Sequence, residues 1–265
     1  MAEARTMDSG RTSSLPLVLI HAFPMTAEMW RPQRDALRGE IPVYTPDLPG
    51  FGAAPGLDEE ALTMDTLAGY VEHLLDAHGI DRCVLGGLSM GGYVALACMR
   101  SMRARIAGLI LADTKAAPDD EDGRKSRISA IERIGSGDYE GFCDALIVKL
   151  LAESTRKSKP DVVANVRRIM ASMHPETASA AVLGMLARPD SRDILPTFDI
   201  PTAVIVGEHD AITNVDEARS MVEAIPDATL HIIPDAGHIS NLENPDAFNA
   251  AVRELVARVG EPVLK

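Results

Sequence analysis

Continuous apolar runs alternate with helical patterns through the first part of the chain. The runs are rich in Leu, Ile and Val, which predicts strands of a parallel sheet that is covered on both faces. The segments between the runs repeat apolar residues at the spacing of an amphipathic helix. We therefore expect strands over 15–23, 41–48, 82–89 and 106–114, and helices over 28–37, 63–79 and 90–102.

The pattern changes after Thr114. The segment over 115–127 is polar and acidic, which is typical of a solvated loop. Helical patterns without a strand pattern follow over 126–134, 138–153, 160–173 and 175–187. The strand pattern resumes over 201–210 and 228–238, with helices over 214–224 and 245–259.

Strands that alternate with helices predict an α/β fold, with a mostly parallel central sheet flanked by helices. We expect the sheet and its helices to form a core over 15–114 and 196–265. Residues 115–195 then form a helical cap, or lid, inserted between two strands, and residues 1–14 form a loose N-terminal tail. In such a sheet, functional groups gather beyond the carboxyl ends of the strands.

Composition and charge limit the class of protein and the kinds of partner that fit this chain. Hydrophobic residues make up 46% and charged residues 25% of the 265 residues, which is typical of a soluble globular enzyme. The formal net charge is −13 and no dense block of Lys and Arg is present, so we expect no nucleic acid partner. We see no apolar stretch like a signal peptide or a membrane span, and the odd number of cysteines, 3, argues against a disulfide framework. These observations predict a soluble, cytoplasmic protein and leave its oligomeric state open.

One serine stands between glycines directly after an apolar run, in the stretch GGLSMGG over 86–92. Gly87 to Gly91 match G-x-S-x-G, in which a tight strand-to-helix turn exposes a serine oxygen for nucleophilic attack. The stretch fits neither G-x-G-x-x-G nor G-x-x-x-x-G-K, which disfavours a phosphate-binding loop. Ser89 is therefore the candidate nucleophile.

Two further candidates follow predicted strands. Asp210 ends the run AVIVGEHD, and His238 ends the segment LHIIPDAGH. The chain order Ser, Asp, His is that of the α/β-hydrolase triad. Asp113 also follows a strand and is an alternative acid, whereas Asp235 fits a turn better.

The sequence resembles the α/β-hydrolase family from about residue 15 to 259, and in detail its esterase, 3-oxoadipate enol-lactonase and haloperoxidase-like branch. HAFPM over 21–25 looks like the family's H-G-x-P oxyanion loop, and DLPGFG over 47–52 like its D-x-x-G-x-G turn. GEHD resembles the acid segment of the family, which favours Asp210 over Asp113. Ala22 stands where the loop usually has glycine, and alanine would be strained there if the position needs a positive φ.

The resemblance implies an α/β-hydrolase fold and a serine hydrolase that cleaves a small to medium-sized carboxylic ester or lactone, with no cofactor and no metal. His238 would take the proton of Ser89 and later return it to the leaving group, while Asp210 orients the imidazole. The backbone N–H groups of Met90 and, by resemblance, Phe23 would hold the oxyanion.

The cap is expected to lie over the serine. Its apolar residues are candidates for an acyl pocket, although apolar residues at helical spacing usually belong to a core: Met170, Met173, Leu183, Met185 and Leu186. Three arginines could meet a substrate carboxylate, although exposed arginines are commoner: Arg124, Arg127 and Arg133. We expect His21 to order the oxyanion loop and Asp47 to cap its own turn.

Other functions stay open because a fold does not determine function. A relative with an intact triad can act as a small-molecule receptor with slow turnover. Perhydrolysis or hydrolysis of a carbon–carbon bond could use the same triad. Haloalkane dehalogenase and epoxide hydrolase chemistry is disfavoured, since those relatives carry an aspartate where this chain has Ser89.

Overall fold

The computed structural model describes residues 15–57 and 61–260, so the expected tail over 1–14 lies outside the described residues. Within them, one 6-stranded parallel sheet has the order β2-β1-β3-β4-β5-β6. The strands are β1 (Leu17–Ile20), β2 (Val43–Tyr44), β3 (Cys83–Leu88), β4 (Ile106–Ala112), β5 (Thr202–Gly207) and β6 (Ala228–Ile233). Each predicted apolar run contains one of these strands, and the α/β fold with a mostly parallel sheet is confirmed.

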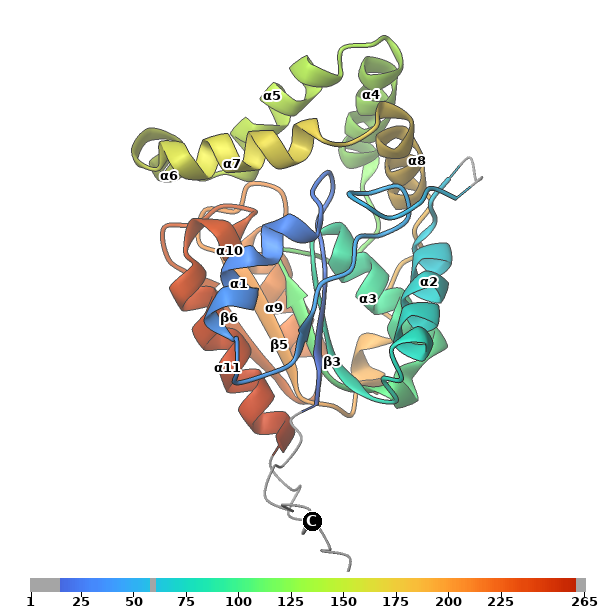
Figure 1. The fold of residues 1–265 in the computed structure, drawn as a ribbon, viewed down its shortest axis with the longest axis vertical. Coiled ribbons are helices and arrows are strands. Elements are labelled where there is room, and N and C mark those ends of the chain that lie inside the picture. Colours follow the sequence, from blue (N-terminus) through green and yellow to red (C-terminus); the bar gives the residue numbers. More distant parts are fainter. Residues whose placement is uncertain (1–14, 58–60, 261–265) are drawn as a thin grey trace, which may run out of the picture.

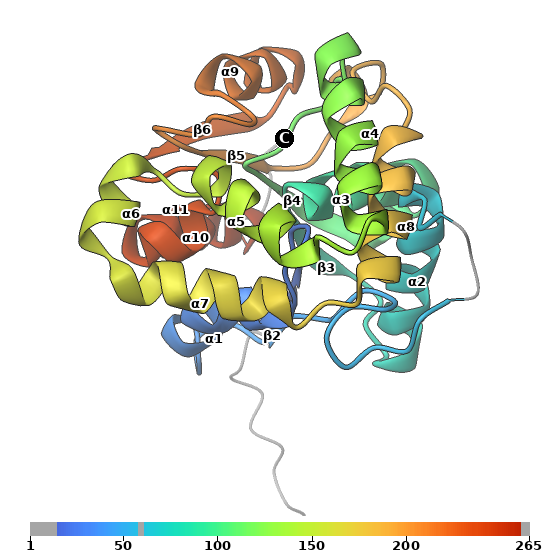
Figure 2. The ribbon, with the colours of Figure 1, turned by 90° about the horizontal axis from the view of Figure 1, so that it is seen from above.

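Helices cover both faces of the sheet (Figures 1 and 2). One face carries α2 (Met64–Ala77), α3 (Met90–Ser101) and α9 (Val215–Ala224), and the other carries α1 (Arg31–Ala36) and α11 (Pro245–Gly260). Short 3-10 helices complete the connections: η1 (Ala27–Trp30), η2 (Arg103–Arg105) and η3 (Leu195–Thr197). The apolar periodicity of the helices therefore fits two layers packed on one sheet.

Local sequence signals determine how these helices begin and which face they bury. The Thr63 side chain accepts a hydrogen bond from the Thr66 amide at 3.1 Å and so caps α2. Leu67, Val71 and Leu75 then repeat at four-residue intervals and are buried. Each such side chain contributes roughly 1.5–3 kcal/mol by leaving water.

The strand order reverses beside β1, because the chain passes from β1 to β2 on one side and then to β3 on the other. Ile20, the last residue of β1, pairs with Gly87 of β3. The loops that follow these two strands therefore start next to each other at the carboxyl edge of the sheet. In open α/β sheets this switch point is where ligands bind.

Helices inserted between β4 and β5 lie above the carboxyl ends of the strands (Figure 1). We call them the cap helices: α4 (Glu121–Gly135), α5 (Tyr139–Leu150), α6 (Glu153–Ser158), α7 (Pro160–Ala171) and α8 (Pro175–Leu186). The expectation of a loop throughout 115–127 is wrong, since α4 starts at Glu121. Asp120 accepts a hydrogen bond from the Gly123 amide at 2.7 Å, and acidic residues are favourable in a first helical turn. The division of the chain into a core and a cap at residues 115 and 195 stays a prediction.

The cysteines and the apolar segments agree with a protein built around one core. Cys83, Cys98 and Cys143 are free thiols, and all three are buried. Burial raises the pKa of the Cys83 thiol to about 11, which keeps it protonated and unreactive at neutral pH.

Among the helices that the structure describes, none is both long and apolar enough to cross a bilayer.

Candidate active site

Ser89 occupies the turn between β3 and α3 in a conformation that is unusual for a residue with a side chain. Its φ is 55° and its ψ is −112°, a strained combination of a kind that costs about 1–3 kcal/mol. The neighbouring glycines allow this turn, because a Cβ on Gly87 would lie 2.0 Å from the Gly91 carbonyl oxygen and a Cβ on Gly91 would lie 2.2 Å from that of Ile20. The turn lifts the half-buried Ser89 hydroxyl above the sheet.

The structure brings the three predicted triad side chains together. The Ser89 Oγ lies 2.8 Å from Nε2 of His238, and Nδ1 of His238 lies 2.8 Å from Oδ2 of Asp210. Ser89 follows β3, whereas Asp210 and His238 lie in loops that follow β5 and β6. Residues far apart in the sequence thus form one hydrogen-bonded chain at the carboxyl edge of the sheet.

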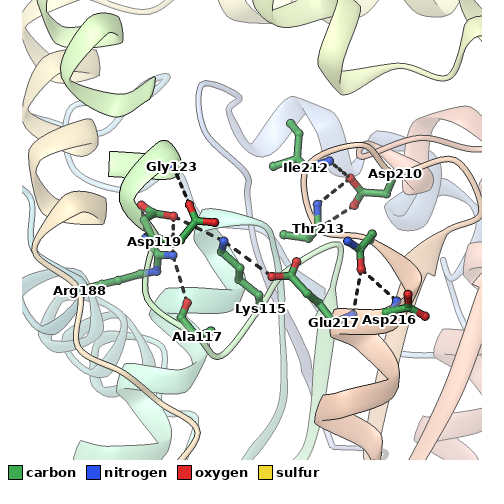
Figure 3. A network of polar contacts seen from close by, with 12 residues as sticks. Lys115, Ala117, Asp119, Gly123, Arg188, Asp210, Ile212, Thr213, Asp216 and Glu217 are labelled. Carbon is green, nitrogen blue, oxygen red and sulfur yellow. Dashed lines mark hydrogen bonds and ion pairs between the residues drawn. The ribbon is translucent and has the colours of Figure 1, made fainter. Parts of the chain in front are cut away.

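Asp210 is held as a carboxylate by four donors. Its Oδ1 accepts from the Ile212 amide at 2.7 Å and the Thr213 amide at 2.9 Å (Figure 3). Its Oδ2 accepts from the Thr213 hydroxyl at 2.7 Å and from His238. Burial alone would raise the pKa of Asp210, but the adjacent imidazole and these hydrogen bonds outweigh it and lower the pKa. The charge of Asp210 therefore persists although its side chain is buried.

His238 is set up to accept a proton at Nε2. Because the Asp210 carboxylate accepts at Nδ1, the proton of the neutral imidazole belongs on Nδ1 and the Nε2 lone pair faces the Ser89 hydroxyl. Burial lowers the pKa of His238, but the charge of Asp210 and its hydrogen bond outweigh burial and raise the pKa above its ordinary value. The arrangement thus stabilises an imidazolium once it forms.

Asp113, the alternative acid, is engaged elsewhere. Its Oδ1 accepts from the Gly207 amide at 2.8 Å, and its Oδ2 accepts from the Ser240 hydroxyl at 2.5 Å. Burial, followed by the nearby charge of Asp210, raises its pKa well above the ordinary value. Both carboxyl oxygens are bonded to groups other than His238, so the geometry favours Asp210 as the partner of the imidazole.

The loop after β1 carries the predicted oxyanion donor Phe23. His21 holds this loop, since its Nδ1 lies 3.0 Å from the Ala22 carbonyl oxygen and its Nε2 accepts from the Leu48 amide at 3.0 Å. Burial lowers the pKa of His21 to about 4, so its ring is neutral at pH 7. Among the described residues other than glycine, positive φ values occur at Ser89, Asp113 and Asp235. Alanine at position 22 therefore causes no strain of that kind.

Asp47 belongs to the DLPGFG turn over 47–52 and also contacts the segment that follows the oxyanion loop. Its Oδ2 accepts from the Ala53 amide at 3.0 Å, as expected for a residue that caps its own turn. Its Oδ1 also accepts from the Ala27 amide at 2.7 Å, a contact that the sequence did not indicate. Asp47 thus connects the turn over 47–52 to the segment that follows the oxyanion loop. Met90, which carries the other expected amide donor, starts α3 directly after Ser89.

The predicted pocket residues lie in the cap helices α7 and α8 or, for Met173, in the turn between them, and they are mostly interior. Met170, Met173 and Met185 are buried, whereas Leu183 and Leu186 are half-buried. Their role in binding an acyl group stays a prediction. A cavity of about 320 Å³ lies between β2 and α2, and Ser89 is not among its lining residues.

The three candidate arginines are committed to other contacts. Arg127 pairs with Asp119, Arg133 pairs with Asp138, and Arg124 donates to the Leu186 carbonyl oxygen. Arg127 and Arg133 are therefore each already paired with a carboxylate.

A network that the sequence did not suggest joins the cap to the core (Figure 3). Asp119 accepts two hydrogen bonds from the buried guanidinium of Arg188, at 2.7 and 2.8 Å, and a third from Arg127. Arg188 also lies 4.2 Å from the ring centre of Tyr93 on α3. Lys115 stands between Asp119 at 3.7 Å and Glu217 at 3.8 Å. No motif marks these residues, because their partners come from separate elements.

One group of side chains in the described part of the chain has the composition of a metal site. Glu208, His209 and Asp235 place their ligand atoms within 4.8 Å of one another, and all three are exposed. The Oε2 of Glu208 already accepts a hydrogen bond from the Asp235 amide. The proposed chemistry makes no use of this group.

The comparisons with known proteins agree with the α/β fold described above. Residues 17–251 match the model of the alpha/beta hydrolase family. The chain is 31% identical over 248 residues to 3-oxoadipate enol-lactonase 1 of Acinetobacter baylyi, with 91% of this chain and 88% of that protein covered. A thermophilic esterase from Thermogutta terrifontis, solved with malate bound, is 40% identical with a TM-score of 0.90, covering 94% of this chain and 92% of that one. An enol-lactonase from Burkholderia xenovorans is 26% identical with a TM-score of 0.84, covering 94% of both chains.

Proposed function

This chain belongs to the alpha/beta hydrolase family, and on that premise we propose that it is a serine hydrolase that cleaves a small to medium-sized carboxylic ester or lactone. The observation that carries the proposal is the hydrogen-bonded chain from the Ser89 hydroxyl through His238 to Asp210. A neutral imidazole between a hydroxyl and a carboxylate is the arrangement that activates serine for acyl transfer.

In the acylation half of the reaction, Nε2 of His238 removes the Ser89 proton as the oxygen attacks the substrate carbonyl. The carbonyl oxygen becomes an oxyanion, which the amides of Met90 and Phe23 receive. Each such donor contributes about 100- to 1,000-fold in rate. The tetrahedral intermediate then collapses, the bond to the leaving alcohol breaks, and the imidazolium gives its proton to that oxygen.

Water completes the cycle by the same steps. His238 accepts a proton from a water molecule that attacks the acyl carbon, and the second tetrahedral intermediate releases the Ser89 oxygen, which regains its proton. The net reaction adds one water across the acyl–oxygen bond. An open-chain ester yields an acid and an alcohol, whereas a lactone yields one hydroxy acid. The chemistry needs neither a metal nor an organic cofactor.

The choice of substrate class rests on what the relatives are named. The enol-lactonase of Acinetobacter baylyi and the esterase of Thermogutta terrifontis share 31% and 40% identity with this chain. Both names are consistent with cleavage of an ester bond, in which the leaving group is an oxygen.

A hydrolysis panel tests the proposal. Aryl esters of increasing acyl length, thioesters and lactones are supplied to the protein and to its Ser89→Ala variant. We expect turnover of at least one ester or lactone, and a loss of about 10⁴-fold or more in kcat when Ser89 is replaced. Tight binding of these compounds without turnover would instead support a receptor. Equal turnover by the two proteins would refute Ser89 as the nucleophile.

A further inference from the structure

Glu243 is a buried carboxylate that joins the loop carrying His238, which we call the catalytic loop, to the cap. It ends the short helix α10 (Ser240–Glu243) and is 2% exposed. Its Oε1 accepts from the Gly237 amide at 2.9 Å, and its Oε2 accepts from the Ala152 amide at 2.9 Å. Gly237 directly precedes His238, and Ala152 lies between the cap helices α5 and α6. The two oxygens therefore link segments that are far apart in the sequence.

The same two segments touch through their backbones. The His238 amide donates to the Leu150 carbonyl oxygen at 2.8 Å. A Cβ on Gly237 would lie 2.6 Å from the Ala152 nitrogen and 3.0 Å from the Leu150 oxygen, so only glycine allows this approach. Lys159 adds a contact from the cap by donating to the Glu243 carbonyl oxygen at 2.7 Å. Residues 150–152 of the cap thus lie directly against the loop that carries His238.

Burying a carboxylate in this place is unfavourable unless hydrogen bonds compensate for the water that it loses. Burial raises the pKa of Glu243 above its ordinary value and outweighs the hydrogen bonds from the Ala152 and Gly237 amides, which lower it. Both oxygens face N–H donors, so an ionised carboxylate satisfies the site better than a neutral group that must itself donate. Each amide would otherwise be a buried donor without an acceptor, which is unfavourable.

We infer that Glu243 is a positioning residue for the reaction proposed above: by fastening residues 150–152 of the cap to Gly237, it holds the His238 imidazole between Ser89 and Asp210. The inference rests on the proposed function. A cap that lifted at Ala152 would release the loop of the catalytic base. We therefore expect this end of the cap to stay docked during turnover.

The Glu243→Gln variant tests the inference because glutamine keeps the size of the side chain but can accept at only one position. Its amide nitrogen must face the N–H of Ala152 or Gly237, so one link is lost. We expect kcat on an aryl ester to fall about 10- to 100-fold, with KM changed by less than about threefold, since the base is misplaced while the pocket remains. Glu223→Gln, at an exposed position of α9, is the matched control and should leave kcat unchanged.

Two further readouts do not depend on hydrolysis. We expect the downfield Nδ1 proton of His238, which reports its bond to Asp210, to broaden or vanish in Glu243→Gln and to persist in Glu223→Gln. Hydrogen exchange of the wild-type protein should show the amides of Ala152 and His238 opening together. These measurements test the positioning role even if no ester is cleaved, so they separate a failure of this inference from a failure of the proposed function.

The inference is overturned by a Glu243→Gln protein with wild-type kcat and an unchanged Nδ1 signal. If this variant does not fold, the wild-type exchange experiment decides alone. Amides of Ala152 and His238 that open independently, with clearly different free energies, would show that the cap does not hold the catalytic loop.

Discussion

One imidazole sets the pH range of the proposed reaction. His238 must be neutral to accept the Ser89 proton, and its pKa is raised above the ordinary value of about 6.5 because the charge and hydrogen bond of Asp210 outweigh burial. Activity is therefore complete above the raised pKa and falls as the pH decreases through it. We predict an acid limb of kcat/KM with a midpoint above about 6.5. A profile that stays flat down to about pH 5 would contradict a histidine base.

The two buried aspartates at the strand ends have different roles, and matched substitutions separate them. Asp210→Asn removes the acceptor that sets the tautomer of His238, so kcat should fall about 10⁴-fold. Asp113→Asn keeps an acceptor for the Gly207 amide and can donate to Ser240, so we expect a loss of less than about tenfold. Steady-state kinetics on one aryl ester compare the variants. An Asp113→Asn defect as large as that of Asp210→Asn would exchange their assigned roles.

The sequence indicated the three candidate triad residues more clearly than the residues that hold them in place. Ser89, Asp210 and His238 could be proposed because each follows a strand and lies in a segment that resembles a triad segment of the family, and parallel strands bring their carboxyl ends to one edge. Thr213 and Glu243 could not be found in this way, because their importance comes from hydrogen bonds to groups in other segments. A polar residue in a loop carries no sign of which distant amide it will meet.

At the scale of elements, Asp119 connects the two ends of the cap. It lies just before α4 and pairs with Arg127 on α4 and with Arg188 just after α8. The side chains of Arg188 and Asp119 are 4% and 5% exposed, so this ion pair is buried. Burial alone would raise the pKa of Asp119, but the two guanidinium groups hold it well below the ordinary value. The pair therefore depends on both partners being present.

Removing one charge of this pair should destabilise the protein. Asp119→Asn leaves Arg188 buried without a carboxylate, and we predict a decrease of about 3 kcal/mol in the free energy of unfolding. Because the folded-state pKa of Asp119 is lowered, the contribution is complete above the ordinary pKa of about 3.9 and is lost as the pH falls below it. Urea unfolding at pH 7 and at lower pH measures both effects.

Asp190→Asn provides the control for that measurement. Asp190 pairs with Arg192 at the surface, where the two side chains are 41% and 66% exposed. Exposed pairs contribute about 0–1 kcal/mol, so the control should unfold almost like the wild type. Equal losses in the two variants would show that burial of the Arg188 pair adds nothing to stability.

The elements themselves were predicted unevenly. Strands and long helices follow from hydrophobic periodicity, as in α2 and α3. The start of α4 was missed because its first turn is acidic and polar, although Asp120 and the acidic residues after it are good helix-starting signals. The expected helix over 138–153 breaks at 151–152, where the backbone leaves the helix and Glu243 binds the Ala152 amide. A tertiary contact thus accompanies a boundary that periodicity does not show.

At the scale of the whole molecule, the order of the strands places the loops of the candidate site next to one another. The apolar runs predict a parallel sheet but not that β1 lies between β2 and β3, which places the oxyanion loop beside the serine turn. The depth to which the cap packs on the core also depends on contacts between separate elements, such as those of Arg188 and Glu243.

The central claim is that folding turns Ser89 into a nucleophile, and covalent labelling tests it most directly. A fluorophosphonate probe is incubated with the native protein, with the Ser89→Ala variant and with heat-unfolded protein, and the intact masses are measured. We predict one adduct on the native protein, located on the peptide that contains Ser89, and none on the variant or the unfolded chain. A folded protein that stays unlabelled, or a Ser89→Ala variant that is labelled equally, would contradict the account.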